Sequence, residues 1–160
     1  MEIRFACRED IPGIIRLLKQ VGQVHHEGRP DIFRQGAQKY NESQVESMLG
    51  KKDDPIFVAV EKGQVLGYGF CMLQAHRGDS VLADFSTLYI DDICVEENCR
   101  GQHVGAAIYR HVCDYAKTLG CRSVTLNVWC CNPGAMAFYQ KLGMQPQKIG
   151  MEQLLEDTQC

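Results

Sequence analysis

The segment from residue 88 to residue 119 constrains the fold of this chain more than any other stretch. A run of β-forming residues (88–95) is followed by a polar loop, Arg100-Gly101-Gln102-His103, and then by apolar residues at helical spacing from Val104 to Leu119. Unpaired N–H groups at the start of a helix attract anions. The order therefore predicts a strand, a phosphate-binding loop and a helix within an α/β fold.

The glycines near this loop match neither of the two common nucleotide-binding motifs. A P-loop requires Lys-Ser or Lys-Thr after its glycines, and a dinucleotide-binding fingerprint has a third glycine; both are missing around Gly101 and Gly105. The loop is therefore expected to bind the pyrophosphate of a nucleotide-like cofactor in some other way.

The composition indicates one globular domain covering residues 1–160, because 45% of the residues are hydrophobic and no change in composition marks a linker. The formal net charge is -3 and the Lys and Arg residues are scattered, so nucleic acid is not an expected partner. The N-terminus lacks an apolar signal region, and no apolar run reaches the roughly 18 residues that span a bilayer. We therefore expect a cytoplasmic protein without a membrane partner.

The nine cysteines are odd in number and include no C-x-x-C pair. Several of them lie in apolar segments, which favours reduced, structural thiols. The pairs His25-His26 and Cys130-Cys131 have no further ligands at the spacing of a zinc site. No metal is expected, and a Cys/His metal protein remains a minor alternative.

The rest of the pattern alternates between strands and helices, with ends marked by Gly, Pro and Asn. It predicts a mixed, mostly antiparallel α/β sheet with helices on both faces. The expected strands are 3–6, 56–61, 65–73, 82–95, 124–128 and 148–154, with a hairpin turn at 62–64, and the expected helices are 11–22, 42–49, 104–119 and 133–142. Residues 156–160 would be a frayed tail.

The polar segment 24–39 is too irregular for a long element and is the best candidate for a flap over an acceptor. Several side chains in or near this segment could contact an acceptor, although for each of them an ordinary position in a polar surface loop is the simpler interpretation. They are His25, His26, Glu27, Asp31 and Tyr40.

Two motifs resemble the GNAT superfamily of acyl-CoA-dependent N-acetyltransferases. The loop from Arg100 to Gly105 resembles the family pattern Arg/Gln-x-x-Gly-x-Gly/Ala, with His103 in place of the central glycine. Histidine tolerates a positive φ better than most residues do, so a bent loop is still expected. The block from Asn132 to Met144 resembles the family pattern Asn-x-x-Ala-x-x-Phe-Tyr-x-Lys-x-Gly-Phe.

The resemblance implies acetyl-CoA as the acetyl donor and assigns roles to matching residues. Tyr139 would protonate the departing thiolate, and Asn132 would bind the pantetheine arm, although Asn132 could also simply cap a helix. The Arg100 side chain could contact phosphate or simply face solvent. Backbone N–H groups would bind the pantetheine and thioester at Ile93, Cys94 and Val95, and the pyrophosphate at Arg100, Gly101, Gln102, His103, Val104, Gly105 and Ala106.

An ammonium acceptor must lose a proton before it attacks, which calls for a base such as a carboxylate. Asp91 and Asp92 interrupt an apolar strand, and their segment resembles the Tyr-Leu-Glu-Asp run of polyamine acetyltransferases. Because neighbours on a strand point to opposite faces, we expect only one to meet the acceptor. Asp91 is preferred as the base and Asp92 is second, with a structural hydrogen bond as the alternative for either.

The leading hypothesis is direct acetyl transfer, in a ternary complex, to a primary amine of a small molecule such as a polyamine or an aminoglycoside. A protein or peptide amine is the competing acceptor. A CoA-binding sensor without turnover is the alternative from a different functional class. Relatives of this family often pair through terminal strands, so a homodimer through residues 144–155 is a further option.

Overall fold

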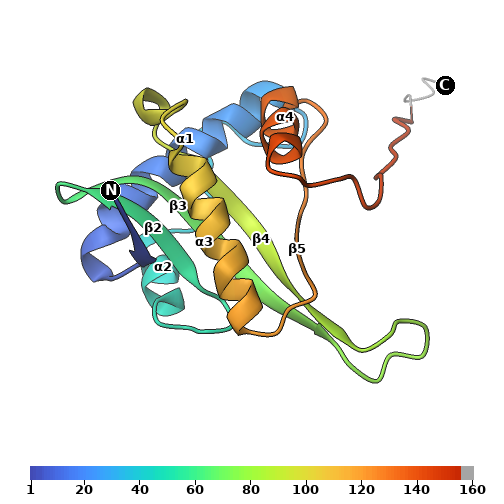
Figure 1. The fold of residues 1–160 in the computed structure, drawn as a ribbon. Helices are drawn as coiled ribbons and strands as arrows, with labels where there is room; N and C mark the ends of the chain where they lie inside the picture. The colour runs from blue at the N-terminus through green and yellow to red at the C-terminus, as the bar shows by residue number, and fades with distance from the viewer. Residues whose placement is uncertain (156–160) are drawn as a thin grey trace.

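The computed structural model describes residues 1–155, and its centre is a five-stranded sheet in the order β1-β2-β3-β4-β5 (Figure 1). The strands are β1 (Glu2–Phe5), β2 (Ile56–Glu61), β3 (Gln64–His76), β4 (Phe85–Val95) and β5 (Ser123–Leu126). Neighbours from β1 to β4 are antiparallel, whereas β5 runs parallel to β4. The mixed, mostly antiparallel sheet predicted from the sequence is confirmed.

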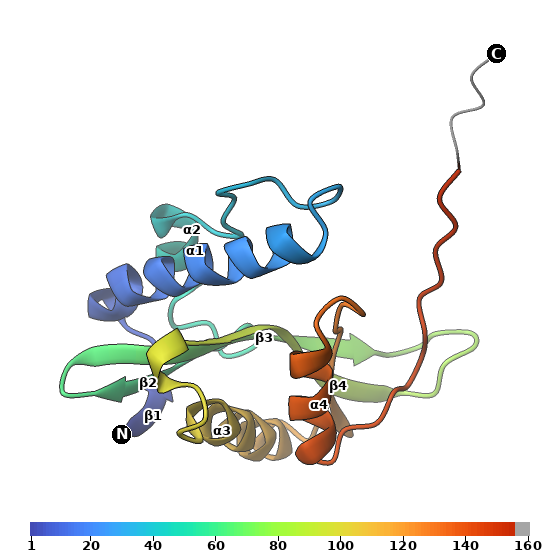
Figure 2. The ribbon, with the colours of Figure 1, turned by 90° about the horizontal axis from the view of Figure 1, so that it is seen from above.

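Helices cover both faces of this sheet, as predicted. The helices are α1 (Ile11–Gly28), α2 (Glu42–Met48), α3 (Val104–Thr118) and α4 (Pro133–Lys141), with short 3₁₀ turns η1 (Arg8–Asp10) and η2 (Glu97–Cys99). Figure 2 shows α1 and α2 on one face and α3 on the other, and α4 lies near the end of β5 (Figure 1). No helix within residues 1–155 combines the length and the apolarity that a membrane span requires.

Alternating side chains on the strands give the sheet a separate core on each face. On the α1 face, Ile14 and Leu18 are fully buried in one cluster with Tyr68 of β3. On the α3 face, Ile108 packs in a second cluster with Phe57 of β2. Burial of each such side chain stabilises the fold by about 2 kcal/mol. The two cores hold α1 and α3 against opposite faces of β3 and β4.

The first helix is longer than predicted, because Gly22 lies inside α1 rather than at its end. A Cβ atom at Gly22 would lie only 2.1 Å from the carbonyl oxygen of Ala37, so the glycine lets the loop after α1 cross the helix closely. The predicted stop at residue 22 is wrong for this reason. His25 and His26 therefore lie on the last turns of α1.

The hairpin between β2 and β3 forms at the predicted turn, where Lys62 and Gly63 have φ values of 48° and 76°. The longer hairpin between β3 and β4 extends to the pair His76 and Phe85 and projects from the body (Figure 1). β4 starts at Phe85 rather than at residue 82 because the carboxylate of Asp79 accepts the backbone N–H of Leu82 at 2.8 Å, forming a turn there.

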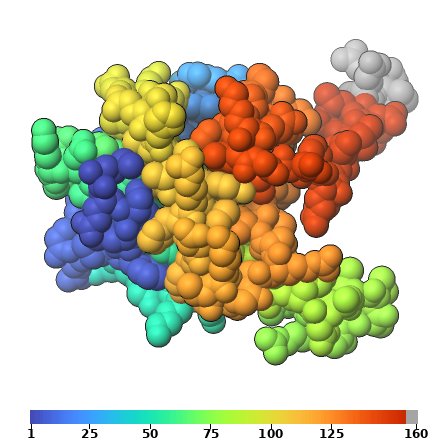
Figure 3. Space-filling view, viewed as in Figure 1, coloured from blue at the N-terminus to red at the C-terminus, as the bar shows by residue number. Residues whose placement is uncertain are grey.

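The strand predicted for residues 148–154 does not form. This segment is extended, but it pairs with no strand within residues 1–155, and Ile149 and Met151 are 76% and 89% exposed. Arg29 binds Glu152 through two hydrogen bonds of 3.0 Å, and the segment stands away from the body in Figure 3. An apolar pattern makes a strand only where a neighbouring backbone supplies hydrogen bonds. The predicted tail at 156–160 lies outside the described residues.

Candidate active site

A gap opens where β4 and β5 part. The two strands pair only from Thr87 with Ser123 to Ile90 with Leu126, whereas β4 continues to Val95 with β3 as its only partner in the described chain. Figure 1 shows the strands diverging towards the loop before α3 on one side and towards α4 on the other. The outer edge of β4 beyond Ile90 therefore has no strand beside it, although the carbonyl of Val95 there accepts a hydrogen bond from Gln20 Nε2 at 3.0 Å, and its N–H groups can bind a ligand.

Backbone alternation decides which amides face this gap. The N–H of Glu96 donates to Leu66 on β3 at 2.8 Å, so the amide two residues earlier, at Cys94, also points towards β3. The amides of Ile93 and Val95 then point to the free edge. Of the N–H groups proposed from the sequence for the pantetheine arm, Ile93 and Val95 lie on the required side and Cys94 does not.

The Cys94 side chain belongs to the core. It is 4% exposed, and its Sγ lies 3.5 Å from the carbonyl oxygen of Leu17. Burial, followed by the charge of Asp92, raises the pKa of the Cys94 thiol to about 12. A protonated thiol in this position is unsuited to act as a nucleophile.

The loop before α3 has the bend that the sequence predicts. Gly101 and His103 have φ values of 77° and 64°, and His103 directly precedes the first residue of α3. The first α-helical bond here runs from Ala107 N–H to His103 O at 2.9 Å, so the amides of residues 104–106 have no acceptor within the helix. The geometry at His103 confirms the expected bent loop, which suits an anion.

The side chains of this loop point in different directions. Val104 and Ala106 are buried, so these residues offer only their backbone to a ligand. Gln102 donates to the carbonyl of Asn98 at 3.0 Å, and Arg100 is exposed. Figure 3 shows atoms of the α1 region, in blue, between this yellow loop and the orange-red α4.

Asn132 caps α4 and Tyr139 lies within it, and this helix packs on the start of α3, where a Cβ atom at Gly105 would lie 3.1 Å from the ring of Phe138. Asn132 Oδ1 accepts the N–H of Ala135 at 3.0 Å, as predicted for a helix cap, and this leaves the amide nitrogen of Asn132 available to a ligand. Tyr139 packs against Phe138, with ring centroids 5.0 Å apart. Burial, and next the negative charge of Asp92, raise the pKa of Tyr139 well above its usual value. Tyr139 therefore keeps its proton at neutral pH.

Asp91 and Asp92 lie at a β-bulge. The pairing changes from Phe70 with Asp92 to Cys71 with Ile90, so Asp91 has no partner of its own on β3. A bulge interrupts the alternation of side chains. Asp91 binds Tyr40 and Asp92 binds Tyr68, both on the α1 face, so the expectation that the two carboxylates face opposite sides is wrong.

The two carboxylates have different surroundings. Asp91 Oδ1 lies 2.6 Å from Lys39 Nζ, and its Oδ2 accepts the hydroxyl of Tyr40 at 2.8 Å. Asp92 Oδ2 accepts the hydroxyl of Tyr68 at 2.7 Å. Burial raises the pKa of Asp92, and the hydrogen bond from Tyr68 opposes this only in part. Asp92 is the better proton acceptor of the two, because both Asp91 oxygens are already occupied.

Three aromatic rings link the C-terminal part of α1 to the loop before α4, and sequence reasoning missed two of them. His25 stacks on Phe33 at 4.9 Å between centroids, and Phe33 meets Trp129 edge-on at 5.2 Å. Trp129, the only tryptophan of the chain, precedes α4 and is 41% exposed. The available signal was its position, as a lone tryptophan between the predicted strand 124–128 and the predicted helix that starts at residue 133. We call His25, Phe33 and Trp129 the aromatic row.

The other candidate flap residues have local partners. Glu27 accepts a hydrogen bond from Gln23 at 2.8 Å, and Asp31 pairs with Arg29 at 2.7 Å. His26 Nδ1 lies 2.7 Å from the carbonyl oxygen of Phe33. His26 therefore fixes the position of the Phe33 backbone.

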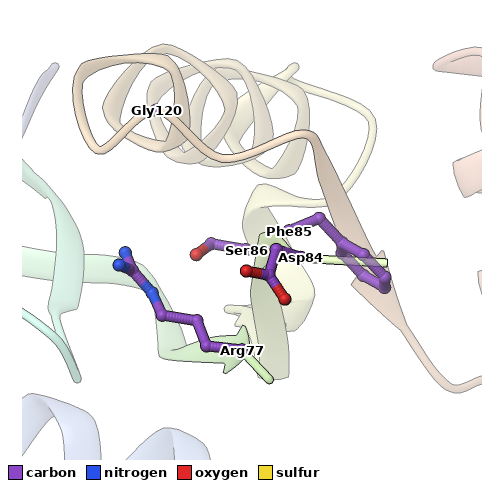
Figure 4. A pocket seen from close by; sticks show the side chains of 5 residues that line it. All are labelled: Arg77, Asp84, Phe85, Ser86 and Gly120. Carbon is purple, nitrogen blue, oxygen red and sulfur yellow. The ribbon is translucent and has the colours of Figure 1, made fainter. Parts of the chain in front are cut away.

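A separate hollow lies at the far end of β4. Arg77, Asp84, Phe85, Ser86 and Gly120 line it (Figure 4). It adjoins the end of α3, whereas the bent loop at Gly101 and His103 is at the start of that helix. Within residues 1–155, no group of three or more His, Cys, Asp or Glu side chains could hold a metal ion, and the cysteines there are free.

Comparison with known proteins agrees with this geometry. Residues 20–144 match the family model of the GNAT acetyltransferases. The chain belongs to the GNAT family. Members of this family use acetyl-CoA as the acetyl donor. The same fold is seen in the crystal structure of a mutant BH1408 protein from Bacillus halodurans. That protein is 31% identical, the TM-score is 0.92, and the match covers 97% of this chain and 99% of that one.

Curated GNAT relatives differ in the acceptors that their names state. N-alpha-acetyltransferase 30 of Schizosaccharomyces pombe is 28% identical over 87 residues, which are 54% of this chain and 55% of that protein. Glucosamine 6-phosphate N-acetyltransferase of Arabidopsis thaliana is 29% identical over 68 residues, which are 42% and 44% of the two chains. The chain spans about half the length of the curated relatives it matches.

Proposed function

We propose that this protein transfers the acetyl group of acetyl-CoA directly to a primary amine within a ternary complex. One observation carries the proposal: the edge of β4 beyond Ile90 has no further strand, the amides at the start of α3 have no acceptor within the helix, and Asp92 is near enough to Tyr139 for its charge to raise the pKa of that hydroxyl. The edge suits a thioester arm, the amides suit a diphosphate, and the two side chains supply the acid and base that aminolysis of a thioester needs.

In this proposal the cofactor-binding groups act mainly through the backbone. The free amides of residues 104–106 hold the pyrophosphate, with Gly101 and His103 beside them, whereas the amides of Arg100 and Gln102 already donate to the carbonyl oxygens of Glu97 and Cys99. The Arg100 side chain adds a charge-assisted contact. Ile93 and Val95 bind the pantetheine arm and polarise the thioester carbonyl. Asn132 contributes its amide nitrogen, because its oxygen is used in the helix cap.

Asp92 takes the proton that the acceptor ammonium must lose, directly or through water, and Tyr139 gives a proton to the departing thiolate. The thiolate has an ordinary pKa near 8.5, so a protonated Tyr139 beside it can act as the acid once charge develops. Asp91, first choice from the sequence, becomes a positioning residue because Lys39 and Tyr40 occupy it. The free amine attacks the thioester carbon without an acetyl-cysteine step.

We propose a small-molecule amine as the acceptor, with a peptide or protein amine as the competing class. Lys39 and Tyr40 tie the loop between α1 and α2 down onto β4 at Asp91. A loop held down in this way favours a small acceptor over an extended chain. The presence of both Asp92 and Tyr139 argues against a CoA-binding sensor without turnover.

Two measurements test the function. Titration calorimetry should detect binding of CoA and of acetyl-CoA, and an assay of thiol release from acetyl-CoA should show turnover with members of a panel of small amines and peptides. Binding without turnover for every amine would favour the sensor, and the absence of any binding would refute the enzymatic proposal. Turnover restricted to peptides would support the competing acceptor class.

We also propose that two copies associate through the segment 144–155. Its apolar side chains Ile149, Met151, Leu154 and Leu155 are 73–89% exposed, and the outer edge of β5 has no strand beside it within residues 1–155. An extended segment from a second copy could cover that edge. Light scattering should give the mass of a dimer for the wild type and the mass of a monomer for the double variant Ile149→Asp/Met151→Asp. The control variant Gln147→Asp should remain a dimer. A monomeric wild type would refute the proposed association.

A further inference from the structure

Two side chains of α1 hold the segment in which β4 ends. Gln20 Nε2 donates to the carbonyl oxygen of Val95 at 3.0 Å, and Gln20 Oε1 accepts the N–H of Glu97 at 3.4 Å. Arg16, about one helical turn earlier, pairs with the carboxylate of Glu96. The end of β4 is therefore attached to α1 at three consecutive residues.

The carboxamide of Gln20 fits its two partners in one orientation. The Val95 carbonyl needs a donor, which the amide nitrogen supplies, and the N–H of Glu97 needs an acceptor, which the amide oxygen supplies. Glu96 Oε1 shares the N–H of Glu97 at 3.2 Å. The shorter bond, to Val95, is therefore the main contribution of Gln20.

Val95 lies between the two proposed subsites for acetyl-CoA. Its N–H points to the edge of β4 that would bind the pantetheine arm. Its side chain packs against the start of α3, where a Cβ atom at Gly105 would lie 3.4 Å from Val95 Cγ2. The amides of residues 104–106, which would bind the diphosphate, belong to this same turn of α3. A shift of Val95 would therefore change the distance between the two sets of donors.

Glu97 leads from the end of β4 to the bend before α3. It begins η2, and its carbonyl oxygen accepts the N–H of Arg100 at 3.2 Å. Gly101 and His103 follow with positive φ. One carboxamide on α1 thus contacts the last residue of β4 and the first residue of the turn that leads to the amides of α3.

We infer that Gln20 is a positioning residue for acetyl-CoA. By fixing the Val95 carbonyl and the N–H of Glu97, it holds the edge of β4 and the start of α3 at the spacing that one cofactor needs. The inference rests on the proposed function and adds a residue of α1 to the cofactor site. Two halves of one ligand reinforce each other only when their subsites are correctly spaced.

Titration calorimetry with CoA and steady-state kinetics test this role. Gln20→Met keeps the length of the side chain and removes both hydrogen bonds. It should raise the Kd for CoA and the KM for acetyl-CoA about tenfold. At saturating acetyl-CoA, kcat and the KM for the amine should stay nearly unchanged, because other bonds hold the reacting groups, such as that between Tyr68 and Asp92.

An isosteric variant and a matched control complete the design. Gln20→Glu keeps the acceptor for Glu97 but replaces the donor to Val95 by a negative oxygen, so it should weaken CoA binding at least as much as Gln20→Met. Gln23→Met makes the same change further along α1, where Gln23 donates to exposed Glu27 at 2.8 Å, and it should leave Kd and KM unchanged. Thermal melting of each variant checks that it is folded.

The outcomes separate the role of Gln20 from the proposed function. A wild-type Kd for CoA in folded Gln20→Met or Gln20→Glu overturns this role and leaves acetyl transfer standing. A smaller fraction of binding-competent protein with unchanged Kd, or equal weakening in Gln23→Met, assigns Gln20 a merely structural role and also overturns it. If the wild type binds neither CoA nor acetyl-CoA, the proposed function fails and the inference falls with it.

Discussion

The hydroxyl of Tyr68 donates a 2.7 Å hydrogen bond to Asp92 Oδ2, and Tyr68 itself is completely buried. Burial raises the pKa of Tyr68 well above its usual value, so Tyr68 keeps its proton and remains a donor at neutral pH. The bond holds Asp92 in place through one oxygen. Asp91, one residue earlier, has both oxygens occupied by Lys39 and Tyr40.

We predict that Asp92 sets the acidic side of the pH profile of kcat/KM. Because burial raises the pKa of Asp92, activity should fall as the pH drops through a value above the ordinary carboxylate range, where the base becomes protonated. Asp92→Asn should lower kcat by about 100-fold or more and remove this limb. Asp91→Asn should keep the fall of activity at low pH and should mainly raise KM for the amine. If instead Asp91→Asn removed this fall and Asp92→Asn kept it, Asp91 would be the base.

Tyr139→Phe removes the proposed acid and leaves the ring packing intact. We expect kcat to fall by about 100-fold while the Kd for acetyl-CoA stays the same, because the proton is needed only as the thiolate leaves. Stopped-flow or steady-state assays of thiol release measure kcat, and titration calorimetry measures the Kd for acetyl-CoA. Tyr109→Phe, on the neighbouring tyrosine of α3 whose ring centroid lies 6.3 Å away, is the matched control and should keep its activity. A fully active Tyr139→Phe would refute the role.

His103 holds a positive φ of 64° at the entrance to α3. His103→Gly should bind CoA at least as well as the wild type, because glycine adopts this conformation without cost. His103→Val should weaken CoA binding at least tenfold, since a β-branched residue resists positive φ. Titration calorimetry measures both variants, and equal affinities would show that the bend at residue 103 does not govern cofactor binding.

Asp10 should be important for stability rather than for activity. It is 5% exposed, and it accepts hydrogen bonds from Arg4 at 2.6 and 3.0 Å and from the N–H of Cys7 at 2.9 Å. Burial alone would raise the pKa of Asp10, but the bonds from Arg4 and Cys7 together lower it below the usual value. Asp10→Ala should therefore reduce the free energy of unfolding by about 3 kcal/mol at neutral pH.

The pH dependence of this effect has a definite sign. A carboxyl whose pKa is lowered by folding stabilises the protein above its unfolded pKa of about 3.9, and the contribution is lost as the pH falls through the lower, folded value. Urea unfolding should show the difference between wild type and Asp10→Ala shrinking below about pH 3.9. Glu9→Ala, at the exposed neighbour, should change stability little. If the difference in free energy of unfolding between wild type and Asp10→Ala stayed constant below about pH 3.9, the stabilising role of ionised Asp10 would be contradicted.

Local features of the site were predictable from sequence because neighbouring residues determine them. The bend at His103, the start of α3 after it and the cap formed by Asn132 depend on backbone preferences and on contacts within a few residues. The same is true of the turn at Lys62 and Gly63. The GNAT motifs lie on these locally determined elements.

Contacts between distant segments decided the rest. Gly22 lies within α1 because the backbone at Ala37 crosses it, and the segment 148–154 is no strand because no backbone pairs with it. The bulge at Asp91 depends on the register against β3, and it turns both carboxylates to one face. The sequence by itself determined most of the helices and strands and the bent loop before α3. Only the tertiary structure decided the extent of α1, which carboxylate keeps a free oxygen and that Phe33 meets Trp129, because those partners come from segments far apart in the chain.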